Sequence, residues 1–266
     1  DNSYNFMNVY EDFAYYFINF DLGPGKRIQD SDVNVNSNII SRYDEYQYIN
    51  EEKFNLMKVG RIWIGDSFSE PKTVTFTTRF PLQTTDVIKY RARLIGYQSN
   101  GNKVDFNLNN TESGVFAVQA TEKNEYVMGY FFGNTSNFSG NQLSFNFTPS
   151  FSANPQGKFF FDYAEVQYKQ DLKFNNAQMN FRSYDISEGS GTTYTFRMSD
   201  ASSIEQVWQV SDVTNVTRKV NKSGGNANFD FGYVADSDLF VNEFVAFKSA
   251  DAFLPSFVGK TENQDL

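Results

Sequence analysis

Apolar and polar residues alternate along much of the chain after Gly60, which is typical of strands with one face in a core and the other in water. In Ile88–Leu94 the apolar side chains share one face, and Lys89, Arg91 and Arg93 share the other. Turns rich in Asn and Gly separate such stretches. About eight strands fit before Lys169, the number typical of a jelly roll. Residues 59–172 are therefore predicted to form a jelly-roll-like antiparallel β-sandwich.

A long strand at Lys158–Leu172 is predicted to end this first sandwich, because its run of phenylalanines suits burial and its later residues alternate. Strand patterns then recur at Thr193–Met198, Glu205–Val210, Asn226–Tyr233 and Leu239–Phe247. About five to seven strands over this length match an immunoglobulin-like sandwich. We therefore expect an all-β chain whose second, smaller sandwich spans residues 173–256.

The two ends of the chain are less regular. Residues 1–58 are predicted to be an irregular segment packed on the first sandwich, with a buried strand at Phe13–Phe20 and a short helix at Glu51–Lys58. Residues 257–266 are predicted to be a linker toward a further domain. Because the chain starts at Asp1 without an initiator Met or an apolar signal segment, we expect it to be a trimmed or excised piece of a longer protein.

The composition excludes several kinds of chemistry, since the chain contains no Cys and no His. Without Cys there is no disulfide, thiolate metal site or cysteine nucleophile, and without His there is no Ser-His-Asp triad. Catalysis would have to use carboxylates, Lys, Tyr or Ser/Thr alone, and we predict no catalytic residue, no metal and no cofactor. The net charge of −9 argues against nucleic acid as a partner. No apolar run approaches the roughly 20 residues that a membrane-spanning helix needs.

Carboxylate pairs remain as possible catalytic groups, because glycoside hydrolysis can proceed with two acids. Asp162 and Glu165 lie three residues apart on a predicted strand, so they point to opposite faces unless a bulge intervenes. Asp236 and Asp238 share a face if extended, but they lie in a loop rich in Ser and Asp. We interpret all four as exposed carboxylates. A carboxylate-based glycosidase remains a rival that would turn over a glycoside.

The polar loop Asp30–Asn38 spaces its oxygen-bearing side chains as a calcium loop does. Val35 and Ser41, however, stand where an EF-hand needs Gly and Glu, so a solvated loop is favoured and calcium binding stays open.

The stripe of Lys89, Arg91 and Arg93 offers a possible contact for an anionic polysaccharide, with a solvated sheet face as the alternative. Trp63 and Trp208 could stack on sugars, but their apolar neighbours favour core packing.

Six short motifs follow one another in an order that resembles one protein family. They are Gly60–Phe68 (Gly-Arg-Ile-Trp-Ile-Gly-Asp-Ser-Phe), Asp162-Tyr163, Phe181-Arg182, Val207–Asp212, Glu243–Phe247 and Gly259–Leu266. Together they are similar to the N-terminal region of the PorU-type sortases of the bacterial type IX secretion system, which are gingipain-like cysteine peptidases. Asp66, Ser211 and Asp265 depart from the Glu, Thr and Asn expected there. Residues 1–58 match only loosely.

The resemblance implies a cell-surface or outer-membrane enzyme that removes C-terminal signals from cargo and attaches the cargo to anionic lipopolysaccharide. Its catalytic Cys and His would lie in a peptidase domain after Glu262–Leu266, so no catalytic residue carries over to this chain. The implied partners are that downstream peptidase domain and a PorV-type outer-membrane barrel, with the β modules in a structural or docking role. The rival from another class is a carbohydrate-binding module that uses the basic stripe.

Overall fold

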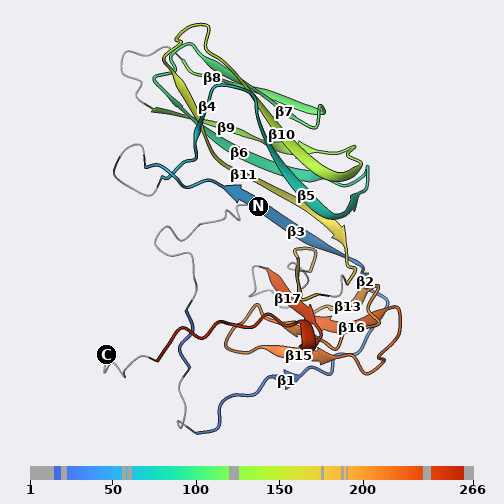
Figure 1. The fold of residues 1–266 in the computed structure, drawn as a ribbon. Coiled ribbons are helices and arrows are strands. Elements are labelled where there is room, and N and C mark those ends of the chain that lie inside the picture. The colour runs from blue at the N-terminus through green and yellow to red at the C-terminus, as the bar shows by residue number, and fades with distance from the viewer. Residues whose placement is uncertain are drawn as a thin grey trace. The chain divides into compact units, whose positions relative to one another are not determined.

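Strands account for nearly all of the regular structure (Figure 1). The computed structural model describes residues 15–18, 23–55, 58, 62–119, 126–174, 177–186, 189, 191–235 and 241–260. Within these ranges the only helix is the 3₁₀ turn Ser249–Asp251, so the predicted all-β class is confirmed. No helix in the described part of the chain is long and apolar enough to cross a membrane.

The chain divides into two units. The first contains residues 1–24 and Asp44–Gln170, and the second contains Gly25–Tyr43 and residues 171–266. The chain therefore passes into the second unit after Gln170, at the end of the long strand.

Two antiparallel sheets form the first unit. One sheet has the order β3 (Arg42–Asn50), β11 (Lys158–Asp171), β6 (Ile88–Tyr97) and β9 (Tyr126–Thr135), with β4 (Ser67–Phe68) also paired to β11. The other has the order β5 (Lys72–Leu82), β10 (Gly140–Ser150), β7 (Lys103–Leu108) and β8 (Glu112–Ala117). Successive strands often lie in different sheets, as β5 and β6 do, and jelly rolls share this kind of crossing.

Aromatic side chains from both sheets fill the core of the first unit. Phe106 on β7 stacks on Phe131 of β9 with ring centroids 4.7 Å apart, and it also meets Phe145 and Phe147 of β10 at 5.7 Å each. These side chains belong to one continuous buried cluster. Because the inner faces of two sheets share this core, the predicted β-sandwich is confirmed.

A β-bulge interrupts the pairing of β11 with β6 between Phe161 and Tyr163. Phe161 lies in the core before the bulge and Ala164 lies in it afterwards, so the inward-facing set changes from odd to even positions. Asp162 is the extra residue. It faces outward with Arg93, and Glu165 is also on the outer face. The bulge thus places the two carboxylates on one face, against the expectation for a regular strand. Asp162 and Glu165 are both buried, so the interpretation of these two as exposed carboxylates is wrong.

The second unit also has two sheets around an aromatic core. One has the order β1 (Gln29–Asp30), β15 (Thr217–Val220), β14 (Gln206–Gln209), β17 (Asn242–Phe247) and β12 (Met179–Ser183). The other has the order β16 (Phe229–Val234), β13 (Thr193–Met198) and β2 (Ile39–Ile40). Phe196 of β13 stacks on Phe231 at 5.3 Å and meets Phe244 of β17 at 4.9 Å, which joins the sheets.

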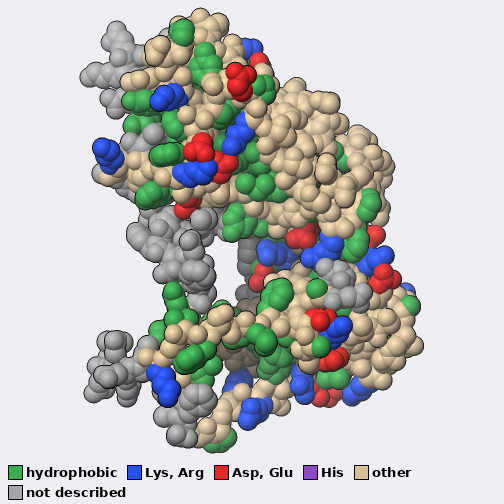
Figure 2. Space-filling view, in the orientation of Figure 1, with side chains coloured by type: hydrophobic (Ala, Val, Ile, Leu, Met, Phe, Trp, Pro, Cys, Tyr) green, Lys and Arg blue, Asp and Glu red, His purple; other side chains and the backbone are tan. Residues whose placement is uncertain are grey.

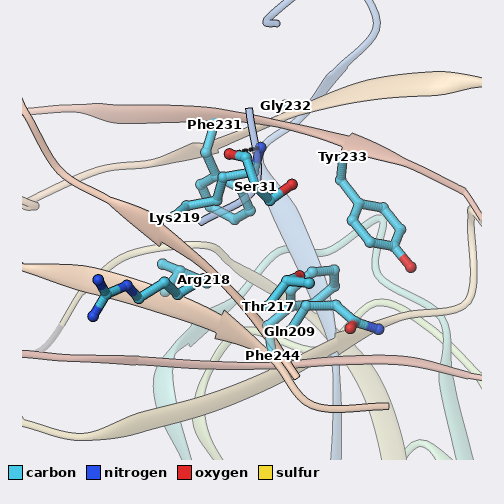
Figure 3. A pocket seen from close by; sticks show the side chains of 10 residues that line it. Ser31, Gln209, Thr217, Arg218, Lys219, Phe231, Gly232, Tyr233 and Phe244 are labelled. Atoms are coloured by element: carbon cyan, nitrogen blue, oxygen red, sulfur yellow. Dashed lines mark hydrogen bonds between the residues drawn. The ribbon is translucent and has the colours of Figure 1, made fainter. Parts of the chain in front are cut away.

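The segment Gly25–Tyr43 completes both sheets of the second unit, so the prediction that residues 1–58 pack together on the first sandwich is wrong for this part. β1 pairs with β15 and β2 pairs with β13, both in parallel. Lys219 donates from Nζ to the carbonyl of Ser31 at 2.6 Å (Figure 3). A strand of two residues is too short to show an alternation of apolar and polar positions, so the sequence does not indicate which unit β1 and β2 join.

Two further expectations for the first 58 residues are wrong where the structure describes them. Residues 15–18 are not in a strand, and their side chains are 54–82% exposed rather than buried. Glu51–Asn55 is not helical, because Phe54 forms an antiparallel bridge with Ile64. Residues 13–14, 19–20 and 56–57 of these predicted elements lie outside the described residues, as do Asp236 and Asp238.

Candidate functional site

The basic stripe lies on the outer face of β6, as the alternation predicts. Ile88, Tyr90 and Ala92 belong to the core cluster, while Lys89 is exposed and Arg91 is partly exposed. Side chains of β6, β9 and β11 line an open groove of about 580 Å³ here. Its lining residues are Lys89, Tyr90, Arg91, Tyr130, Phe132, Gly133, Asn134, Glu165, Val166 and Gln167.

Arg93 has a different role from the rest of the stripe. Its guanidinium forms an ion pair with Asp162, whose side chain is only 3% exposed, and lies 5.0 Å from the ring centre of Tyr163. Burial raises the pKa of the Asp162 carboxyl, and this effect outweighs the lowering by Arg93. Arg93 therefore compensates a buried charge, and it does not line the groove.

Replacing Arg93 with methionine is expected to lower the free energy of unfolding by about 3–5 kcal/mol at neutral pH, because Asp162 would stay buried without its counter-charge. The raised pKa of Asp162 sets the sign of the pH dependence. As pH falls through that pKa, the carboxyl becomes neutral and the loss in Arg93→Met should shrink. Urea unfolding at about pH 7 and about pH 4 measures this difference. A loss that is equal at both pH values would contradict the assignment.

Arg91 lines the groove from β6. Its guanidinium carbon is 5.7 Å from the ring centre of Tyr130, and its cross-strand neighbours are Glu165 on β11 and Phe132 on β9. Glu165 accepts a hydrogen bond of 2.8 Å from the Tyr46 hydroxyl. The groove therefore combines cations and one carboxylate with two partly exposed aromatic rings. This set can bind a polar or anionic ligand with a flat apolar face.

Glu165 and Asp162 share a face, yet each has its own partner, Tyr46 for Glu165 and Arg93 for Asp162. A glycosidase needs one acid that is protonated and a second that faces a substrate bond. The contacts of these two carboxylates serve the sheet instead.

Neither tryptophan lines the groove. Trp63 is 38% exposed, so the expectation that it packs in a core is wrong. Trp208 is partly buried, meets Phe247 edge-on at 5.0 Å and donates to the Gln206 side chain at 2.9 Å.

The polar loop Asp30–Asn38 uses its oxygens for contacts within the second unit. Asp30 pairs with Arg218 at 2.6 Å, and this hydrogen bond lowers the pKa of the Asp30 carboxyl. Asn36 accepts from the backbone N–H of Asn38 and donates to the Thr193 carbonyl. Over the described residues, no group of three or more acidic side chains is placed to hold a metal ion.

A second cavity lies within the second unit, beside the Lys219–Ser31 contact (Figure 3). Its volume is about 10 Å³, which is room for about one water molecule. It is lined by Ser31, Val207, Gln209, Thr217, Arg218, Lys219, Phe231, Gly232, Tyr233 and Phe244. This space is too small for a substrate.

The motif at Gly60–Phe68 has a structural role over its described part. Ile64 is 1% exposed and exchanges backbone hydrogen bonds with Phe54, and the Gly65 N–H donates to the Phe161 carbonyl. A Cβ on Gly65 would lie 2.0 Å from a carboxylate oxygen of Glu51. Glu51 is in turn paired with Lys72 at 2.8 Å. The glycine thus lets these segments approach closely.

Gly65→Ala is expected to destabilise the first unit by about 1–3 kcal/mol, the usual cost of forcing extra volume into a packed site. Glu51 would have to turn away from Lys72 to make room. Thermal unfolding compared with Gly25→Ala, where an added Cβ meets nothing within 4 Å, measures the effect. Equal melting temperatures in the two variants would show that Gly65 is not tightly packed against Glu51.

Sequence reasoning missed the aromatic side of the groove, which Tyr130 and Phe132 provide. The segment Tyr126–Thr135 is apolar at both odd and even positions, so alternation does not show which face is outward. The signal that could have found it is the pair Gly129 and Gly133, since glycines within a strand mark positions where other groups approach closely. A Cβ on Gly129 would meet the Phe116 ring at 2.3 Å.

Comparison with known proteins gives one kind of match. No protein-family model and no curated protein matches this chain. Among solved structures, the chain is similar to dimeric latent PorU from Porphyromonas gingivalis, with a TM-score of 0.72 and 20% sequence identity over 89% of this chain. The match spans 23% of that PorU chain. It supports the resemblance to the N-terminal region of PorU-type proteins, and the chain has a PorU-like β fold.

Proposed function

We propose that this chain is the non-catalytic β region of a PorU-like sortase, and that its two units support a downstream peptidase domain and dock it to secretion partners. The observation that carries the proposal is the fold match to PorU over 89% of the chain. The absence of Cys agrees with it, because a cysteine peptidase would need its nucleophile elsewhere in the protein.

The whole protein would then act at the bacterial surface, removing C-terminal signals from cargo and joining the cargo to anionic lipopolysaccharide. The β units would contribute position and contacts to this reaction. A PorV-type outer-membrane barrel is the proposed docking partner. Acidic and basic side chains are interspersed on the face shown in Figure 2, so specific contacts are a better basis for docking there than one broad electrostatic field.

Reading the coding sequence beyond Leu266 tests the proposal. The expected result is an α/β domain with a paired Cys and His within about 200 residues, the size of an ordinary domain. A following domain without such a pair would contradict the proposal.

A second candidate function is carbohydrate binding, which the groove beside Arg91 favours. Exposed rings of Tyr130 and Phe132 beside a guanidinium and a carboxylate are groups that recognise sugars. A glycan array, followed by titration with anionic lipopolysaccharide, tests this candidate. Saturable micromolar binding that Arg91→Ala abolishes would support it. Binding that Arg91→Ala leaves unchanged would contradict it.

A further inference from the structure

The strand β9 ends its sheet, and among the described strands only β6 hydrogen-bonds to it. Its ten residues pair with β6 in unbroken register from Ile88↔Thr135 to Tyr97↔Tyr126. The strand is therefore regular along its whole length. Over Val127–Thr135 its far edge carries the row of backbone N–H and C=O groups that an edge strand presents.

The residues of β9 lack the features that usually protect an edge. The segment Tyr-Val-Met-Gly-Tyr-Phe-Phe-Gly-Asn-Thr contains no charge, no proline and no bulge. On its outer face Met128, Tyr130 and Phe132 are 38%, 43% and 74% exposed. A long, regular and apolar edge of this kind pairs readily with another strand.

Other edge strands of the two units do carry such protection. β5 has Lys72, Arg79 and Pro81 together with a register irregularity, and β8 and β16 are six residues long with Glu112 and Asp230. β1 and β2 have two residues each. β9 therefore differs from these described strands, because it has none of the features that keep an edge from pairing.

We propose that β9 binds an extended segment of another polypeptide, which adds to the sheet as an antiparallel strand. This site would be the docking surface of the proposed function, so the inference rests on that function. The backbone groups of the edge select a strand over other ligands. Tyr130 is held in place, since Arg91 lies over its ring, so part of the contact surface is preorganised.

The neighbouring cations define the chemistry of the added strand. Lys89 lies opposite Asn134 and Arg91 lies opposite Phe132, each one strand away from the open edge. Strands are spaced about 4.8 Å apart, so an added residue opposite Asn134 is about 10 Å from the Lys89 backbone. A lysine and a glutamate side chain together span that gap. The preferred segment therefore has apolar residues facing Tyr130 and Phe132, and an acidic residue facing Lys89.

A second copy of this chain fits less well. Two β9 strands would bring no acidic residue to either stripe, because the strand has none. An acidic, partly apolar segment of a different protein is the better complement.

The test uses a displayed library of random decapeptides selected on the immobilised whole chain. Selected peptides are expected to alternate apolar residues and to contain at least one acid. Bound to the chain, they should slow hydrogen exchange of amides in Tyr126–Thr135. Phe132→Lys should weaken their binding by up to about fivefold, the effect of losing one aromatic cross-strand pair. Val115→Lys, at a 59% exposed position on the edge strand β8, is the matched control and should leave binding unchanged.

Selection of no peptide, or protection of amides only outside β9, would overturn the proposal. Protection of β9 on concentrating the chain alone, with a dimer in sedimentation, would overturn it in favour of a second copy. If Phe132→Lys does not fold, Met128→Lys replaces it, with the same expected loss. A downstream sequence without a Cys and His pair would remove the proposed function while peptide binding at β9 still stood, so the two failures are distinguishable.

Discussion

Replacing Phe106 with alanine is expected to lower the free energy of unfolding of the first unit by about 3–5 kcal/mol. Phe106 is 3% exposed and contacts rings from both sheets, at 4.7 Å from Phe131 and at 5.7 Å from Phe145 and Phe147. The substitution removes the ring and leaves a cavity that rigid sheets cannot close. Denaturant unfolding followed by tyrosine fluorescence or circular dichroism measures the loss.

Phe132→Ala is the matched control for this prediction, because the same side chain is removed at a position that is 74% exposed. Its expected effect is within about 0.5 kcal/mol. A loss for Phe106→Ala no larger than the loss for Phe132→Ala would show that the two sheets of the first unit are not held together by this aromatic cluster.

Gly232→Ala is expected to destabilise the second unit. A Cβ at Gly232 would lie 2.4 Å from the Asn34 carbonyl oxygen and 2.5 Å from that of Val33. Both atoms are backbone, so they cannot rotate away as a flexible side chain could. The segment Gly25–Tyr43 would have to shift, which strains its contacts such as Lys219 to Ser31.

The expected cost of Gly232→Ala is about 1–3 kcal/mol, the usual range for overpacking. Faster hydrogen exchange in residues 29–40 should accompany it, because β1 and β2 lie in this segment. Gly224→Ala is the control, since an added Cβ there meets nothing within 4 Å. Unchanged exchange in residues 29–40 would show that the second unit does not need this segment in its observed place.

Strands with a strict alternation could be predicted from the sequence. The predicted strand Ile88–Leu94 lies within β6, and Thr193–Met198 is β13. The predicted long strand Lys158–Leu172 corresponds to β11. These strands have one buried face, so the period of two is visible in the residues. The all-β class and the β-sandwich architecture followed from the same signal.

The features that escaped prediction are those without a period. The bulge at Asp162 is hidden because Phe159, Phe160 and Phe161 are apolar on both faces, so the change of phase leaves no mark. β1 and β2 are two residues long and pair in parallel with strands about 150 or more residues away. Phe54 among charged residues suggested a helix, while its bridge to Ile64 depends on tertiary contact.

The candidate site was half predicted for the same reason. Charge on alternate positions identified Lys89, Arg91 and Arg93 as an outward stripe, and β6 has that geometry. Arg93 forms an ion pair with Asp162, and the bulge places Asp162 on the outer face, so this pairing could not be predicted from alternation. The aromatic half of the groove lies on β9, a strand that is apolar on both faces.

Capture of partners by this chain tests our proposal that its β units dock a PorU-like protein at the bacterial surface. The immobilised whole chain would be incubated with a detergent extract of outer membranes from the source cells, and captured proteins identified by mass spectrometry. We expect saturable capture of an outer-membrane β-barrel protein, reduced by Phe132→Lys and retained by Val115→Lys. Capture of no membrane protein, together with saturable binding of free glycan that Arg91→Ala abolishes, would contradict it.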